Sequence, residues 1–114
     1  MIRTKRVYEP TAPDDGARVL VDRIWPHGLA GEDAHIDWWA KELAPTDKLR
    51  RWFGQAPPRY REFVLRYRSE LEGNAAVARL RELAAAGPVT LVYAARDERH
   101  NSARALLEIL NHHA

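Results

Sequence analysis

The stretch VTLVYAARDERHN, residues 89–101, decides the fold. Its first five residues are apolar, aromatic or β-branched, which is typical of a strand buried in a sheet. Its last six residues bring two arginines, two acids, a histidine and an asparagine together. Apolar residues then recur at helical spacing, at Ala103, Leu106, Leu107 and Leu110. The stretch therefore predicts a strand that passes through a polar turn directly into a helix.

Two earlier segments also carry strand signals. IRTKRVYEP, residues 2–10, begins with a short β-like run that ends at its proline. ARVLVDRIW, residues 17–25, holds a continuous apolar run from Val19 to Val21, which suits a strand covered on both faces. We expect the run 19–21 and the strand 89–93 to be adjacent, parallel and buried.

The segment AHIDWWAKELAP, residues 34–45, fits two interpretations. Its apolar residues Ile36, Trp39 and Leu43 have helical spacing, whereas Trp38 and Ala40 alternate as in a strand. Residues 36–43 are therefore a strand or a helix, and the strand is favoured by the resemblance described below.

Helical signals fill most of the region between this segment and residue 89. Each predicted helix begins at an N-cap residue or proline and is followed by a glycine or a turn. The three segments run from Thr46 to Gly54, from Pro57 to Leu71 and from Asn74 to Gly87. Strands first, helices between and a strand feeding a helix predict an α/β fold. We expect a small, largely parallel sheet of about three to four strands flanked by helices, with residues 1–114 forming a single domain.

Composition excludes several classes of protein. The chain has 18 Lys and Arg against 16 Asp and Glu, so its net charge does not indicate a polyanionic partner. It has no cysteine, which excludes disulfides, thiolate nucleophiles and cysteine-bound zinc. No metal-ligand spacing and no glycine-rich nucleotide fingerprint is present, so we expect neither a metal nor a cofactor. No signal peptide and no long apolar run is present, so we expect a cytoplasmic protein without a membrane segment.

Polar residues follow the predicted strands where each strand ends. Asp22 and Arg23 follow the run 19–21, Arg96 to Asn101 follow the strand 89–93, and Lys41 and Glu42 would follow a strand from Ile36. Because ligands of open α/β sheets bind beyond the carboxyl ends of the strands, we expect these groups to converge.

The expected site has two catalytic candidates and five ligand-binding candidates. Arg23 and Arg96 would hold an anion, and Asp22 and His100 would transfer protons. The other ligand-binding candidates are Trp25, which could cover a ligand, Asp97, which could orient His100, and Asn101, which could donate hydrogen bonds.

Each of these residues also has a purely structural interpretation. Asp22 and Arg23 can form an ion pair with each other at the end of a strand. Asp97 or Asn101 can cap the last helix, although we expect capping to account for one of them and not for both. His100 can be a surface residue of a loop.

Three blocks of the sequence resemble a known family. VDRIWPHGL, DWWAKELAPTDKLRRWFG and VTLVYAARDERHN are similar in order and spacing to blocks of the domain of unknown function 488 family (DUF488), in its short YeaO-like branch, over nearly the whole chain. The resemblance implies a small bacterial α/β protein without an established reaction. It also implies that DWWAKELAP is a strand that leads into a turn.

The chain departs from the family pattern at three places. His27 stands where relatives usually have arginine, and Gln55 stands where they often have histidine. Longer relatives have a Cys-His-Arg sequence whose histidine aligns with His100, and Arg99 stands here in place of that cysteine. A cysteine mechanism is therefore not expected.

Three functions are compatible with these residues. The first is a hydrolase or transferase whose anion-binding pocket takes a nucleotide or another anionic small molecule. The second is a nucleic-acid binding module on the Arg-rich helix face from Arg59 to Arg68, which Glu62 and Glu70 interrupt. The third is a non-catalytic ligand sensor with the same pocket. The sequence does not decide between enzyme and binding protein, and it leaves the substrate and the oligomeric state open.

Overall fold

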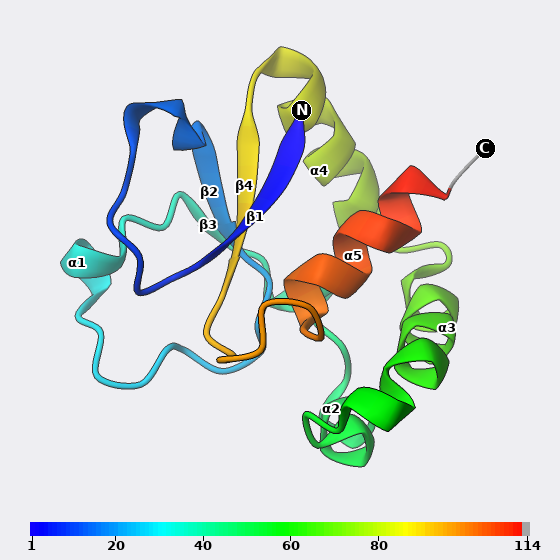
Figure 1. The fold of residues 1–114 in the computed structure, drawn as a ribbon. Coiled ribbons are helices and arrows are strands. Elements are labelled where there is room, and N and C mark those ends of the chain that lie inside the picture. The colour runs from blue at the N-terminus through cyan, green and yellow to red at the C-terminus, as the bar shows by residue number, and fades with distance from the viewer. Residues whose placement is uncertain (113–114) are drawn as a thin grey trace.

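Four parallel strands form one sheet in the computed structural model, which describes residues 1–112 (Figure 1). The strands are β1 (Ile2–Arg6), β2 (Ala17–Leu20), β3 (Trp38–Trp39) and β4 (Val89–Tyr93), and their order across the sheet is β1-β4-β2-β3. All three pairings are parallel, so the carboxyl ends of the strands lie at the same edge. The α/β fold and the parallel sheet predicted from the sequence are confirmed.

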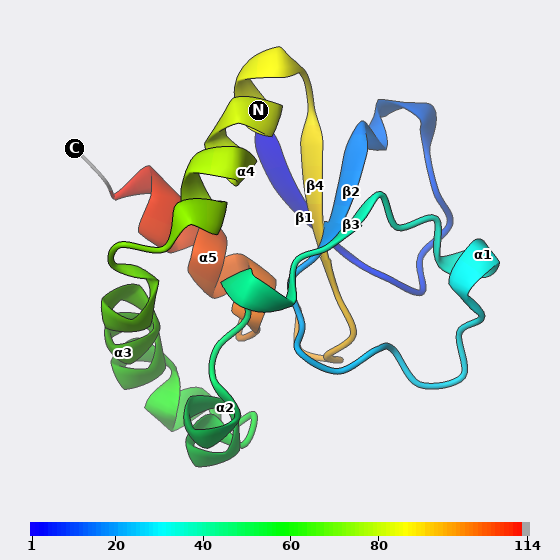
Figure 2. The same cartoon turned by 180° about the vertical axis from the view of Figure 1, so that it is seen from behind.

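The two faces of the sheet are covered differently (Figures 1 and 2). Four helices lie on one side, and a long loop with one short helix lies on the other. The helices on the first side are α2 (Asp47–Phe53), α3 (Tyr60–Leu71), α4 (Ala75–Ala86) and α5 (Ser102–Asn111), and the short one is α1 (Gly31–Ala34). Three-residue 3-10 turns lie at Pro13–Asp15, Lys41–Leu43 and Pro57–Arg59. No helix within residues 1–112 is long and apolar enough to cross a membrane.

The central strand β4 is buried along its whole length. Its neighbour β2 pairs with it in parallel register, with Val19 opposite Leu91. The pairing extends beyond β2, because the backbone N–H of Val21 donates to the carbonyl of Val92 at 3.3 Å. The expectation that the run 19–21 and the strand 89–93 are adjacent, parallel and buried is confirmed.

Alternation along these strands builds two apolar layers. Val19 and Leu91 belong to the main core with side chains of the four larger helices, among them Phe53, Phe63, Tyr67, Leu80 and Leu106. Leu20 and Val92 belong to a smaller core on the opposite side, where they pack with Trp25, Leu29, Ile36 and Trp39. The long loop thus buries the second face of the sheet, as a strand with apolar residues on both sides requires.

Local sequence signals set the helix boundaries. The side chain of Thr46 accepts a hydrogen bond from the backbone N–H of Leu49 at 3.2 Å, and the side chain of Asn74 accepts one from Ala76 at 2.9 Å. Gly54 ends α2 with a left-handed backbone, at φ 54°. The predicted starts of the helices at Thr46 and Asn74 are confirmed.

The ambiguous segment 34–45 contains a strand, but only two residues of it. Trp38 and Trp39 pair with Val19 and Leu20, and the chain then turns into a 3-10 turn, Lys41–Leu43. The pairing is supported on either side by N–H groups of Asp37 and Ala40, which donate to carbonyls of β2. Contacts with β2 thus outweigh the helical spacing, and the strand begins later than Ile36.

Shortening one side chain of the central strand tests this core. Leu91 is fully buried in the main core, so Leu91→Ala should lower the free energy of unfolding by about 2–5 kcal/mol through lost burial and the cavity left behind. Leu65 is 57% exposed, so Leu65→Ala should change it by less than about 0.5 kcal/mol. Urea denaturation of both variants measures the difference, and similar values for the two would contradict the core described here.

Candidate functional site

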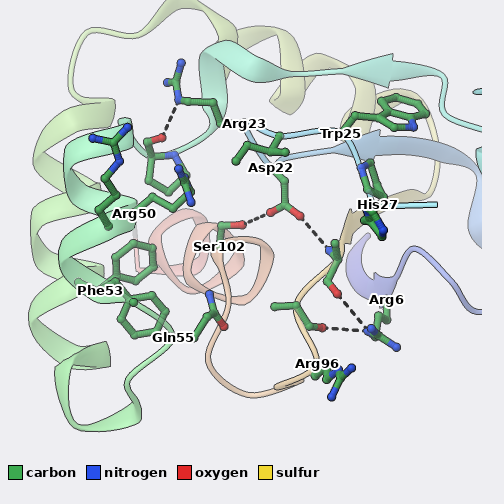
Figure 3. Close-up of a pocket in the computed structure, with 18 of the residues that line it drawn as sticks. Arg6, Asp22, Arg23, Trp25, His27, Arg50, Phe53, Gln55, Arg96 and Ser102 are labelled. Atoms are coloured by element: carbon green, nitrogen blue, oxygen red, sulfur yellow. Dashed lines mark hydrogen bonds between the residues drawn. The ribbon is translucent and has the colours of Figure 1, made fainter. Parts of the chain in front are cut away.

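An open cleft of about 750 Å³ lies beyond the carboxyl ends of β1, β2 and β4 (Figure 3). Its walls come from parts of the chain that are distant in sequence: the end of β1, the segment after β2, helix α2 and the turn between β4 and α5. This is the position at which parallel α/β sheets bind ligands. The lining includes Arg6, Tyr8, Asp22, Arg23, Ile24, Trp25, Pro26, His27, Arg50, Arg51, Phe53, Gln55, Ala94, Arg96 and Ser102.

Asp22 lies at the centre of the cleft and joins the segment after β2 to both ends of the turn between β4 and α5 (Figure 3). One carboxyl oxygen, Oδ2, accepts a hydrogen bond from the backbone N–H of Ala94 at 2.8 Å. The other, Oδ1, accepts one from the hydroxyl of Ser102 at 2.6 Å. Burial raises the pKa of Asp22 above its ordinary value, while these two bonds and the nearby charge of Arg50 act in the opposite direction.

Five arginines line the cleft, against one carboxylate. Arg6 is anchored by its Nε, which donates to the carbonyls of Ala94 and Ala95 at 3.2 and 3.0 Å. Arg23 is anchored in the same way to the carbonyl of Pro45, at 3.0 Å. The remaining three are Arg50, Arg51 and Arg96.

The positive charge of two of these arginines, Arg50 and Arg51, is partly compensated by a carboxylate outside the cleft. Asp47, at the start of α2, lies 3.2 Å from Arg50 and 3.5 Å from Arg51. All three side chains are well exposed, so these pairs are weak. The cleft therefore keeps an excess of positive charge.

Aromatic and apolar groups form the rest of the cleft. Trp25 is held by a hydrogen bond from its Nε1 to the carbonyl of Leu29 at 2.8 Å, and its ring centroid lies 5.1 Å from that of Trp39. Tyr8 and Ile24 line the cleft although they are 41% and 57% exposed.

The structure brings four of the seven site residues predicted from the sequence into this cleft: Asp22, Arg23, Trp25 and Arg96. Asp22 and Arg23 do not form an ion pair with each other, because their hydrogen bonds go to Ala94, Ser102 and Pro45 instead. The interpretation of Asp22 and Arg23 as an ion pair at the end of a strand is therefore wrong.

The strand-end residues Lys41 and Glu42 do not line the cleft. The Lys41 ammonium lies 3.9 Å from the ring centroid of Trp39, and the carbonyl of Glu42 accepts a hydrogen bond from Asn74. Both residues belong to the 3-10 turn that follows β3, which leads the chain away from this edge.

The other three predicted residues, Asp97, His100 and Asn101, do not line the cleft either. Asp97 accepts hydrogen bonds from the backbone N–H groups of Arg99 and His100, and its second oxygen lies 2.8 Å from Nδ1 of His100. The hydrogen bond from His100 and those from the backbone hold the pKa of Asp97 below its ordinary value. The His100 ring packs edge-on against Tyr60, with 4.9 Å between ring centroids.

Asn101 is fully buried and is the N-cap of α5. Its side-chain oxygen Oδ1 accepts a hydrogen bond from the backbone N–H of Arg104 at 2.7 Å, and its side-chain Nδ2 donates to the backbone carbonyl of Asp97 at 2.9 Å. Asn101 caps the helix and Asp97 binds the backbone of the preceding turn. Capping of α5 thus accounts for Asn101 and not for Asp97, as expected from the sequence.

Several lining residues were missed by the sequence analysis. Arg6 is the last residue of β1, so the rule that identified Asp22 after β2 would also have identified Arg6. Ser102 and Arg50 carried no such signal, because they reach the cleft from helices whose packing the sequence does not specify. His27 and Gln55, two departures from the family pattern, both line the cleft.

The arginine face of α3, the alternative nucleic-acid surface, is partly occupied by its own contacts. Arg66 pairs with Glu62 at 2.8 Å and lies 4.4 Å from the ring centroid of Trp52. Arg59 donates to the carbonyl of Trp52. These contacts reduce the number of guanidinium groups available to a phosphate backbone.

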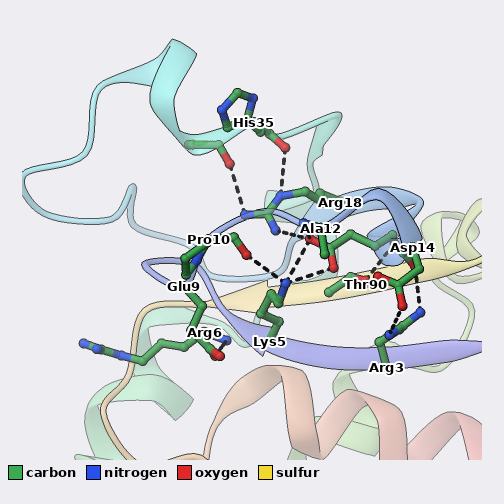
Figure 4. Close-up of polar contacts among 12 residues, drawn as sticks. Arg3, Lys5, Arg6, Glu9, Pro10, Ala12, Asp14, Arg18, His35 and Thr90 are labelled. Atoms are coloured by element: carbon green, nitrogen blue, oxygen red, sulfur yellow. Dashed lines mark hydrogen bonds and ion pairs between the residues drawn. The ribbon is translucent and has the colours of Figure 1, made fainter.

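A second charged cluster lies on the loop-covered side of the sheet (Figure 4). The buried carboxylate of Asp15 accepts hydrogen bonds from Arg18 at 2.8 Å and Lys5 at 3.0 Å, and Arg18 also donates to the carbonyls of Ala34 and His35. Although burial alone would raise the pKa of Asp15, the bonds from Lys5, Ala12 and Arg18 lower it. Every charge of this cluster has a partner, so the cluster anchors the long loop and offers no binding site.

Among residues 1–112, no three His, Asp or Glu side chains lie close enough together to hold a metal ion. In the same part of the chain, no buried polar side-chain atom lacks a hydrogen-bond partner. The polar side chains that line the cleft carry guanidinium, hydroxyl, amide and imidazole groups around one carboxylate.

Comparison with known proteins shows the family. The model of the inactive DUF488-N3 subclade matches residues 1–114, so the chain belongs to the DUF488 family. The uncharacterized protein YeaO of Escherichia coli is 39% identical over 114 residues, which covers 96% of each chain. The uncharacterized protein Rv3073c of Mycobacterium tuberculosis is 46% identical over 110 residues, which covers 96% of this chain and 93% of the relative. No solved structure matches the chain. The resemblance noted from the sequence is confirmed.

The raised pKa of Asp22 predicts a pH-dependent effect of Asp22→Asn on stability. The folded protein holds the Asp22 proton more tightly than the unfolded chain does, so this group lowers the free energy of unfolding as pH rises from the ordinary aspartate pKa to the raised one. The uncharged side-chain amide of the variant avoids this loss of stability. Its oxygen can still accept a hydrogen bond from the backbone N–H of Ala94. The variant should therefore be more stable than the parent near pH 7, by an amount that shrinks toward about pH 4.

Urea denaturation at the two pH values measures this effect. Asp37→Asn, which changes an exposed carboxylate bound to the backbone of Arg18, is the control. A stability difference for Asp22→Asn that is equal at both pH values, or a less stable variant near neutral pH, would contradict the burial of this carboxylate.

The capping role of Asn101 predicts a loss of stability when its side chain is shortened. Asn101→Ala should lower the free energy of unfolding by about 1–2 kcal/mol, because the first turn of α5 loses its acceptor. Asn101→Asp keeps an acceptor and should lose less. Chemical denaturation of both variants measures the difference, and an Asn101→Ala protein of unchanged stability would contradict the capping role.

Proposed function

We propose that the chain binds a small anionic molecule in the cleft and acts as a ligand-binding protein rather than an enzyme. The observation that carries the proposal is the composition of the lining, five arginines against the single carboxylate of Asp22. Guanidinium groups bind phosphate and carboxylate in two-point fashion, and their charge acts more strongly in a partly desolvated cleft than in open water.

The anchoring of two arginines supports the proposal further. Arg6 and Arg23 each use Nε to bind backbone carbonyls, and no described residue accepts a hydrogen bond from their Nη atoms. The anchored guanidinium loses less conformational entropy when a ligand arrives. Both arginines are therefore organised for binding before the anion enters.

Three observations favour binding over turnover. The matched subclade is described as inactive, and Arg99 stands where longer relatives of the family have cysteine. In addition, His100 bonds to Asp97 and packs on Tyr60 rather than lining the cleft with Asp22. This position of His100 supports a binding role over proton transfer by Asp22 and His100 on one ligand.

A hydrolase or transferase acting on the same anion is the second candidate. The hydrogen bond from the Ser102 hydroxyl to the Asp22 carboxylate favours it, because a carboxylate can take a proton from a hydroxyl nucleophile. Release of phosphate from a phosphate ester during the binding experiments, abolished by Ser102→Ala, would promote this candidate over the ligand-binding role.

Titration with pyrophosphate and adenosine 5′-monophosphate tests anion binding. Arg23→Gln should weaken the affinity for pyrophosphate by about tenfold, since it removes one charge-assisted contact. Arg96→Gln should weaken it less, because Arg96 is exposed. Isothermal titration calorimetry gives the affinities, and melting temperatures confirm that the variants fold.

Arg61→Gln is the matched control, since it removes the same charge from an exposed residue that does not line the cleft. It should bind pyrophosphate as the parent does. If all three substitutions weakened the affinity for pyrophosphate equally, the net charge of the protein would explain the effect. This result would refute a defined site. Binding of a single-stranded oligonucleotide that depends on Arg61 and ignores Arg23 would support the nucleic-acid alternative instead.

A further inference from the structure

We propose that the anion bound in the cleft also carries an N–H donor, as a nucleotide with an amino-bearing base does, and that the Asp22 carboxylate accepts this donor. The inference rests on the proposed function and names the class of ligand. It starts from Asp22, the one acidic residue among the described residues that line the cleft, which also include five arginines.

Asp22 has unused capacity to accept hydrogen bonds. Each of its oxygens receives one bond from the protein, Oδ2 from Ala94 and Oδ1 from Ser102. A carboxylate offers about four lone-pair positions, so about two remain for other donors. Because Asp22 lines the cleft, a ligand there can reach them.

No cation of the described residues forms an ion pair with Asp22. The contrast with Asp15 is instructive, because that buried carboxylate is paired with both Lys5 and Arg18. A desolvated carboxylate without a paired cation is unfavourable for the folded protein. Such violations of a local rule concentrate at functional sites, where a ligand supplies the missing partner.

The remaining lining fits a flat ring next to the charged group. Trp25, His27 and Arg6 lie on one side of Asp22, and Arg50, Phe53 and Gln55 lie on the other (Figure 3). Tyr8 is exposed beside the cleft, and the Arg6 guanidinium lies 4.8 Å from its ring centroid. The volume of about 750 Å³ is within the usual range for small-molecule sites.

These features favour a nucleotide whose base presents an amino group, with its phosphate on the arginines and its base edge on Asp22. Aspartate is a common acceptor of nucleobase amino groups. A phosphate that carries an alkylammonium group offers the same pair of charges without a ring. The two sources share the combination of an anion and an N–H donor.

Two matched pairs of probes test the inference on the unmodified protein. Guanosine 5′-monophosphate differs from inosine 5′-monophosphate by one amino group, and phosphoethanolamine differs from propyl phosphate by its ammonium group. The guanosine compound should bind about tenfold more tightly than the inosine compound, as expected for a donor that meets a carboxylate. A preference only within the second pair would assign the donor to an ammonium group instead.

The variant Asp22→Asn should shift two affinities in opposite directions. It should weaken guanosine 5′-monophosphate binding by about tenfold, since a charged acceptor is lost. It should strengthen pyrophosphate binding by about twofold to threefold, since the negative charge that repels pyrophosphate is removed. A purely structural role of Asp22 would change both affinities in the same direction. The comparisons within the probe pairs need no variant, so they decide the question even if Asp22→Asn fails to fold.

The outcomes separate this inference from the proposed function. Pyrophosphate binding that depends on Arg23, with no preference within either pair, would retain the anion site and overturn the role of Asp22. Absence of binding by pyrophosphate and by all four phosphate probes would overturn both. Preference for the amino-bearing member of a pair, lost in Asp22→Asn, would establish the inference.

Discussion

The hydrogen bonds of the Asp22 carboxylate hold the carboxyl edge of the sheet together. Oδ2 binds the backbone just after β4, Oδ1 binds the first residue of α5, and Asp22 itself follows β2. The segment after β2 and the turn between β4 and α5, which are distant in sequence, thus meet at one side chain. The positions of Arg23, Trp25 and Arg96 follow from this junction, because each lies within a few residues of a segment that it fixes. The cleft exists because parallel strands end at the same edge and Asp22 ties their continuations to one another.

The carboxylates of Asp15 and Asp22 illustrate how charge is used on the two sides of the sheet. Asp15 is surrounded by cations and backbone donors, and it secures the loop that covers one face. Asp22 has hydrogen bonds but no paired cation, and it lies in a cleft with five arginines. The first arrangement is complete within the chain. The arrangement around Asp22 leaves room for a ligand to supply the missing partner. For this reason we propose that the cleft is a binding site and that Asp22 selects the ligand.

Sequence reasoning succeeded where structure is local. The strand 89–93 and the caps at Thr46 and Asn74 depend on residues within a few positions, and the structure has them as predicted. Sequence reasoning was less complete where packing between distant segments determines the position of a residue. The spacing of Asp97 and His100 correctly suggested that they meet, but it could not give the direction of the turn, which places His100 against Tyr60. Ser102 and Arg50 enter the cleft through helix packing, which no short motif encodes.

The central claim is that anions bind at the carboxyl edge of the sheet, and backbone amide NMR during a titration with pyrophosphate tests it most directly. The account predicts that the largest chemical-shift changes occur at Ala94, Ala95 and Ser102 and around Gly54, all of which line the cleft. Resonances of α3 near Arg61 and Arg68 should change little, because that face lies outside the cleft. Changes centred on α3, or no saturable change in any amide, would contradict the account.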